Sequence, residues 1–110
     1  IHMEQHEFLE QNVFTNLKNL NADFNRNQIY YFSEADFDVV LHRAEHFGIG
    51  IYTIEPRFNG APVDALNHEK SKKKATDAKW YNKAFLTSKH IQPGMEYSAT
   101  YKVSAKLLMR

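Results

Sequence analysis

The feature that most constrains the fold is a capped helix at residues 34–47 that runs straight into an apolar strand. Ser33 can cap the free amides at the start of this helix, and Asp36 three residues later completes a capping box. Gly48 is typical of the position just after a helix C-terminus. The segment "IGIYTI" (49–54) follows at once and is typical of a strand. A helix joined to a strand by one glycine predicts helices packed on a sheet.

Similar patterns predict the other elements. Apolar residues at helical spacing indicate an N-terminal helix over residues 3–21, namely Leu9, Val13, Leu17 and Leu20. We expect the strand at 49–54 to end before Pro56, with a hairpin turn at Asn59 and Gly60. The remaining expected elements are a buried strand at 28–32, a return strand at 61–66, a solvated lysine-rich loop at 67–75, a helix at 77–89 and a strictly alternating strand at 96–103.

The order of these elements predicts the fold class. After the first helix, the chain runs strand–helix–strand–strand–helix–strand, which is the order of a split βαβ plan. We therefore expect an α+β, ferredoxin-like sandwich of a four-stranded antiparallel sheet and two helices, with an extra N-terminal helix. A length of 110 residues fits a single domain, 1–110, with its α+β core at 28–104. Residues 1–2 are interpreted as a cloning remnant before the natural start at Met3.

Composition excludes several classes of protein. The chain has no cysteine, so it has neither disulfides nor thiolate metal sites. No apolar run approaches the roughly 20 residues that a membrane helix needs. The first residues also lack the basic and apolar regions of a signal peptide. From these features we expect a cytoplasmic protein without membrane contact.

The segment "HRAEH" (42–46) matches the inverted zinc-protease signature His-x-x-Glu-His. On a helical wheel, His42 and His46 fall opposite an apolar face, with Glu45 on the flank. That apolar face consists of Phe37, Val40, Leu41, Ala44 and Phe47. A catalytic zinc site needs three ligands and a drier cavity, whereas these histidines should point to water. We interpret the match as a helix surface and predict no metal site.

Charge is unevenly distributed along the chain. Residues 1–66 carry four basic and ten acidic side chains, and residues 67–110 carry ten basic and three acidic ones, although the net charge is only +1. Such asymmetry can mark a binding face, and the alternative is that the two halves interleave so that their fields cancel. The acidic residues predicted to form a binding patch are Glu34, Asp36, Asp38, Glu45 and Glu55.

A second candidate site lies in "IEPRFNG" (54–60), at the predicted end of a central strand. Polar groups at strand ends often form binding sites. Glu55 can accept a hydrogen bond from a ligand amine, and Arg57 can grip a carboxylate or phosphate. Tyr52 and Phe58 are candidate aromatic anchors beside them. The alternative is that Glu55 and Arg57 form a surface ion pair that flanks a proline.

Trp80 follows a lysine-rich stretch, which is one pattern of nucleic-acid binding. Aromatic rings can stack on bases while lysines meet phosphates. The lysines concerned are Lys70, Lys72, Lys73, Lys74, Lys79 and Lys83. We nevertheless expect no nucleic-acid partner, because Trp80 also suits a core position. This alternative fails if Trp80 is buried.

The sequence carries no glycine-rich phosphate loop and no nucleophile elbow. We therefore assign no catalytic residue and no cofactor.

The segment "FGIGIYTIEP" after an amphipathic helix, followed by a late helix and "YSATYKV", resembles small uncharacterised bacterial α+β proteins. It is similar, more loosely, to immunity proteins that neutralise RNA-cleaving bacteriocins. That resemblance implies a non-catalytic inhibitor whose partner is a toxin or nuclease. The predicted function is therefore protein binding through the acidic patch. The alternative is a small-ligand or regulatory domain, expected to be a homodimer, with its site near Tyr52, Glu55 and Arg57.

Overall fold

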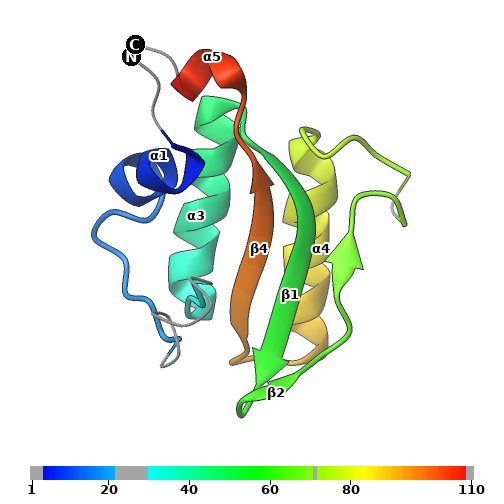
Figure 1. Cartoon of the computed structure of the whole chain (residues 1–110). Coiled ribbons are helices and arrows are strands. Elements are labelled where there is room, and N and C mark those ends of the chain that lie inside the picture. Colours follow the sequence, from blue (N-terminus) through cyan, green and yellow to red (C-terminus); the bar gives the residue numbers. More distant parts are fainter. Residues whose placement is uncertain (1–3, 22–29, 71, 109–110) are drawn as a thin grey trace.

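Two long antiparallel strands, β1 (Gly50–Phe58) and β4 (Glu96–Lys102), form the centre of the fold (Figure 1). The computed structural model describes residues 4–21, 30–70 and 72–108. Two short strands, β2 (Ala61–Pro62) and β3 (Leu66–Asn67), pair with the other edge of β1 and are also antiparallel to it. The prediction of an α+β fold with a four-stranded antiparallel sheet is confirmed.

Four helices accompany the sheet in the described part of the chain. Helix α3 (Glu34–Phe47) packs against β4, and α4 (Ala78–Ile91) packs against β1, while the two helices also contact each other. Helix α1 (Gln5–Asn12) lies beside the C-terminal end of α3 in Figure 1, and α5 (Ala105–Leu108) follows β4. The sequence did not predict α5.

Helix α3 has the boundaries that its local sequence predicts. The Ser33 hydroxyl accepts a hydrogen bond from the Asp36 N–H at 3.2 Å, so this serine is the N-cap. Gly48 adopts the left-handed conformation at φ 70° and ends the helix. The predicted apolar face is confirmed, because four of its five members are fully buried and the fifth, Phe47, is packed against the core.

An aromatic cluster joins both long helices to β4. The Tyr97 ring stacks on Phe37 of α3 with centroids 5.2 Å apart, and it meets Phe85 of α4 edge to face at 5.0 Å. All three side chains are at most 1% exposed. Aromatic rings of this size dominate the burial energy of a small core. The cluster therefore fixes how α3 and α4 lie against the sheet.

Strand β1 continues beyond Pro56, so the prediction that this proline limits the strand is wrong. Pro56 lies opposite Tyr97 in the β1–β4 register. Tyr97 directs both its N–H and its C=O toward Phe32 on the other side, at 2.9 and 2.8 Å. The missing N–H of Pro56 therefore removes no hydrogen bond from the β1–β4 ladder.

The ferredoxin-like topology is not confirmed. A split βαβ sheet has the strand order 4-1-3-2, so its second and fourth strands lie at opposite edges. Here the second expected strand, β1, pairs directly with the fourth, β4. Of the strand expected at 28–32, residues 28 and 29 lie outside the described part, and Phe32 forms only an isolated bridge to Tyr97. The return strand expected at 61–66 is instead two short pieces, β2 and β3, separated by exposed residues.

The N-terminal helix is shorter than the expected range of 3–21. Helix α1 ends at Asn12, and the next residues form turns in which the Phe14 N–H bonds to the Leu9 carbonyl at 2.7 Å. Asn16 has a positive φ of 64°, a conformation that asparagine tolerates better than most residues and that cannot continue a helix. The helical spacing of Leu17 and Leu20 therefore did not extend the helix.

We expect stability to fall in alkaline solution between about pH 10 and 12. Burial, followed by the effect of nearby carboxylates, raises the pKa of Tyr81 and of Tyr97 from 10.0 to about 12. The unfolded chain therefore releases these tyrosine protons at a lower pH than the folded protein does. The free energy of unfolding should be undiminished below about pH 10 and should fall as the pH rises toward 12. Chemical denaturation across this range measures the loss. The variant Tyr97→Phe should lose less, and an unchanged midpoint up to pH 12 would contradict the prediction.

Candidate functional site

A cavity of about 290 Å³ lies between the N-terminal segment and the sheet. Its apolar wall is made by Leu9, Phe14 and Ala99 together with the rings of Tyr30 and Tyr101. Its polar lining comes from Gln5, His6, Glu55 and Thr100. A mostly apolar cavity with a few converging polar groups is the usual form of a small-molecule site, and this volume is at the lower end of that class.

The turn after α1 and the edge of β4 hold this wall in place. Gln5 donates from Nε2 to the Tyr101 carbonyl at 3.2 Å, which ties α1 to β4. The Phe14 ring lies 4.4 Å from the Tyr30 ring and 5.5 Å from the Tyr101 ring, between centroids. The Tyr30 hydroxyl donates to Glu10 Oε1 at 2.9 Å. Burial, and then this hydrogen bond, raise the pKa of Tyr30 to about 12.

Tyr101 contributes a hydroxyl group that has no hydrogen-bond partner among the described residues. The oxygen is buried, and burial raises the pKa of Tyr101 well above its usual value. A buried hydroxyl without a partner costs about 1–3 kcal/mol relative to a satisfied one. Because this oxygen has almost no accessible surface, a ligand in the cavity contacts the ring of Tyr101 and not its hydroxyl.

Glu55 is the only carboxylate among the described residues that line the cavity. It lies on β1 opposite Ser98 of β4, is solvent-exposed, and forms no ion pair with any described residue. Its charge is therefore free to attract a cation. Of the residues that the sequence predicted for this site, Glu55 is the one that lines the cavity.

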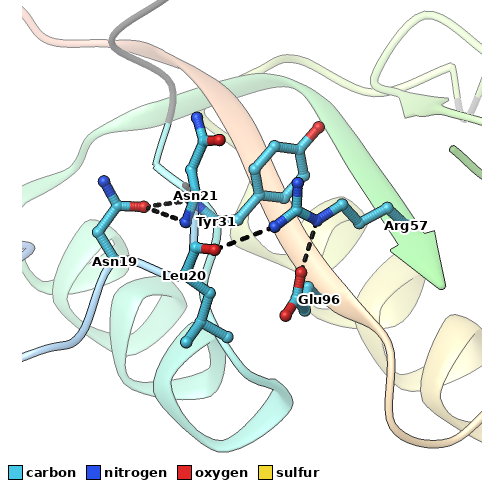
Figure 2. Close-up of polar contacts among 6 residues, drawn as sticks. All are labelled: Asn19, Leu20, Asn21, Tyr31, Arg57 and Glu96. Carbon is cyan, nitrogen blue, oxygen red and sulfur yellow. Dashed lines mark hydrogen bonds and ion pairs between the residues drawn. The ribbon is translucent and has the colours of Figure 1, made fainter. Parts of the chain in front are cut away.

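Arg57 does not share the cavity, because its guanidinium is held by other partners (Figure 2). Its Nε donates to Glu96 Oε1 at 2.5 Å, and its Nη2 donates to the Leu20 carbonyl at 3.2 Å. The same guanidinium lies 3.7 Å from the centre of the Tyr31 ring. The side chain therefore ties two segments before α3 to the sheet.

The segments that Arg57 ties down are also joined to each other. Asn19 Oδ1 accepts hydrogen bonds from the backbone N–H groups of Asn21 and Tyr31, at 2.9 and 3.1 Å. The Leu20 N–H donates to the Tyr31 carbonyl at 2.7 Å. Figure 2 shows these contacts around Arg57, which make a structural cluster. The prediction that Arg57 is a ligand-binding residue has no support from this geometry.

Tyr52 and Phe58, the predicted aromatic anchors, do not line the cavity either. Tyr52 is 41% exposed and occupies the position where the β1–β4 register shifts. Its ring centroid lies 5.9 Å from that of His68. Phe58 is partly buried against the core. The predicted group of Tyr52, Glu55, Arg57 and Phe58 is therefore not a single site.

The predicted acidic residues lie on two elements and have separate partners. Glu34 accepts from the Gly94 N–H at 3.0 Å, and Asp36 accepts from the Lys18 N–H at 3.4 Å. Asp38 lies 3.7 Å from His42 on the same helix. Glu45, which accepts from Asn82 at 3.0 Å, is 11 residues from Glu34, or about 16 Å along the axis.

The fifth acidic residue, Glu55, is on the sheet rather than on α3. The chain therefore gathers Glu34, Asp36 and Asp38 in the first two turns of α3, but it does not join them to Glu45 or Glu55.

The two histidines of "HRAEH" face solvent, as the helical wheel predicts. The His42 side chain is 75% exposed, and His46 is also exposed. Within residues 4–21, 30–70 and 72–108, no group of three or more histidine, aspartate or glutamate residues is arranged to hold a metal ion.

Trp80 is buried, so the alternative in which its ring stacks on nucleic-acid bases is wrong. The side chain is 3% exposed, and its Nε1 donates to the Ile51 carbonyl at 3.1 Å. A ring that is fixed in this way cannot stack on a base.

Most of the cavity was missed by sequence reasoning. Gln5, His6, Phe14, Tyr30 and Tyr101 were never singled out as site residues, and their types carry no motif. A wall assembled from α1, the following turn and β4 has no signature in any one stretch of sequence. The alternation of "EYSATYKV" places Tyr101 on the face of Tyr97, but it does not indicate a cavity.

Comparisons with protein-family models, curated proteins and solved structures gave no match to this chain. In the part of the chain that the structure describes, no helix combines the length and apolar character needed to cross a membrane.

Proposed function

We propose that this α+β domain binds a small molecule with an apolar body and an amine or other cationic group. The observation that carries the proposal is the cavity between α1 and β4, which has aromatic walls and the carboxylate of Glu55. This carboxylate forms no ion pair with any described residue. Aromatic faces and a carboxylate both favour a cation, and the apolar wall favours a ligand body that leaves water.

Two polar groups can orient such a ligand. Glu55 accepts hydrogen bonds from the ligand amine, and this charge-assisted contact is stronger than a neutral one. The hydroxyl of Thr100, an exposed residue that lines the cavity, can pair with an acceptor on the ligand. Gln5 is less suited to binding, because its amide already donates to the Tyr101 carbonyl.

Thermal-shift titration with phenethylamine, and with phenethyl alcohol as its uncharged counterpart, tests the charge preference. The amine should stabilise the protein more than the alcohol, and Glu55→Gln should abolish that difference while leaving the unliganded protein unchanged. Loss of the exposed charge should weaken amine binding by about fivefold or more at low salt. The matched control is Glu69→Gln, which removes an exposed glutamate outside the cavity. Equal binding of amine and alcohol would contradict the proposal.

The variant Tyr101→Phe separates a role in binding from a role in stability. Because the hydroxyl has no partner among the described residues, its removal should leave the free energy of unfolding unchanged or raise it by up to about 1 kcal/mol. Because the hydroxyl is buried away from the cavity, the same variant should bind the amine as tightly as the original chain does. A loss of stability would show that the hydroxyl is already satisfied.

A second proposal is an immunity-type inhibitor that meets a basic toxin or nuclease through acidic residues. It is supported by Glu34, Asp36 and Asp38, which cluster in the first two turns of α3 and are partly exposed. Binding to a candidate basic nuclease should weaken between about 0.1 and 0.5 M salt, where surface charges are screened. Asp38→Asn should weaken it further. A cytoplasmic location and a homodimer stay predictions.

A further inference from the structure

A second cavity, of about 340 Å³, lies between β3 and the outer side of α4 and shares no residue with the first. Its floor is apolar and consists of Leu66, Trp80 and Ala84. Its rim carries Lys73, Lys79, Lys83 and Thr87, and none of the described residues that line it is acidic. A hollow with an apolar floor and a cationic rim suits a ligand of opposite charge that also has an apolar part.

The positive charges of the three rim lysines are not neutralised by ion pairs with described residues. None of them forms an ion pair with a carboxylate in the part of the chain that the structure describes. Lys79, Lys83 and Thr87 are spaced four residues apart on α4, so they lie along one side of this helix. The positive charges of Lys79 and Lys83 therefore act together over the same hollow.

The backbone of Lys73 is held by the turn that precedes α4. His68 and Lys73 form two contacts: the Lys73 N–H donates to the His68 carbonyl at 3.1 Å, and His68 Nδ1 lies 2.8 Å from the Lys73 carbonyl. The His68 N–H in turn donates to the Tyr52 carbonyl of β1 at 3.1 Å. Residues 67–75, which were expected to form a solvated loop, therefore place Lys73 opposite the lysines of α4.

The indole of Trp80 forms a rigid part of the floor. Its hydrogen bond to the Ile51 carbonyl at 3.1 Å fixes the ring, and only 3% of the residue is exposed. A ligand in this hollow therefore contacts only a small part of the ring.

We propose that this second cavity binds a small organic anion, with its carboxylate, sulfonate or phosphate group on Lys73, Lys79 and Lys83 and its apolar body over Leu66, Trp80 and Ala84. Lysine ammonium groups act as point charges and can bind any of these anionic head groups. The apolar floor distinguishes such a ligand from an inorganic anion. This site is independent of the proposed function, because its charge preference is opposite to that of the cavity at Glu55.

The intrinsic fluorescence of the protein tests the proposal, because Trp80 is the only tryptophan in the chain. The probe is naphthalene sulfonate, and its comparisons are uncharged naphthol and inorganic phosphate. We expect the sulfonate to change Trp80 fluorescence saturably. The other two probes should bind more weakly by about tenfold or more, because naphthol lacks the charge and phosphate lacks the apolar body.

A double variant, Lys79→Gln with Lys83→Gln, should weaken sulfonate binding by about tenfold or more at low salt. Glutamine has a helix propensity similar to that of lysine, so the variant should keep α4 folded. The matched control, Lys102→Gln with Lys106→Gln, removes two exposed lysines elsewhere and should bind like the original chain.

Three results would overturn the assignment. They are equal affinity for sulfonate and naphthol, equal weakening by both double variants, and tighter binding of a single-stranded oligonucleotide than of the sulfonate. The last result would instead indicate a nucleic-acid surface along these lysines.

Discussion

Replacing Tyr97 by alanine is expected to lower the free energy of unfolding by about 3–5 kcal/mol, the cost typical of removing a buried aromatic ring. The ring is completely buried on β4, between Phe37 of α3 and Phe85 of α4. Its removal leaves a cavity at the point where both helices meet the sheet. The loss should lower the melting temperature by more than about 10 °C for a domain of this size. Thermal and urea denaturation measure it.

The matched control is Tyr97→Phe, which keeps the ring and removes only the hydroxyl. That oxygen is buried and has no hydrogen-bond partner among the described residues. The control should therefore be as stable as the original chain, or more stable by up to about 1 kcal/mol. If Tyr97→Phe is as unstable as Tyr97→Ala, the ring packing is not the cause, and the hydroxyl must have a partner.

Replacing Arg57 by alanine is expected to lower the free energy of unfolding by about 2–3 kcal/mol. Hydrogen bonds to charged groups contribute about 1.5–3 kcal/mol, and a cation–π contact adds about 0.5–1 kcal/mol, reduced here by partial exposure of the ion pair. The Arg57 and Glu96 side chains are 20% and 34% exposed. The variant also leaves the Leu20 carbonyl without its donor.

The effect should be local as well as global. Hydrogen exchange should become faster at the amides of Leu20 and Tyr31, because Arg57 holds the segments that contain them. Arg57→Lys should recover only part of the loss, since an ammonium group cannot reach Glu96, Leu20 and the Tyr31 ring together.

Lys89 provides the comparison for Arg57. It lies 4.7 Å from the centre of the Phe85 ring but forms no ion pair with a described residue. Lys89→Ala should change stability by less than about 1 kcal/mol. A stable Arg57→Ala variant that loses ligand binding would instead restore the interpretation of Arg57 as a ligand-gripping residue.

The two cavities differ in the charge of the side chains that line them. One places a carboxylate, Glu55, beside aromatic walls, and the other places three lysines over an apolar floor. The charge asymmetry of the sequence therefore has a structural counterpart, although not the single acidic patch that it predicted. Amines and organic anions should bind independently, which titration of each probe in the presence of the other can measure.

The sequence by itself determined the elements whose signals are local. Ser33 and Gly48 set the ends of α3 because a cap bonds within its own turn, and the spacing from Phe37 to Ala44 set its buried face. Strict alternation located β4 to within one residue. The same local signals failed at Leu17 and Leu20, where turns after α1 override a helical spacing.

Only the tertiary structure decided how these elements meet. The pairing of β4 with β1 joins residues 39 to 52 positions apart in sequence, and such pairing depends on the whole sheet rather than on either strand. It brought Glu96 to Arg57 and so made a predicted ligand residue into a structural one. The packing of α1 on β4 placed Gln5 beside Tyr101, and the packing of α4 placed Trp80 in the floor of the lysine-lined cavity. A cavity is defined by the packing of distant segments and not by any one of them.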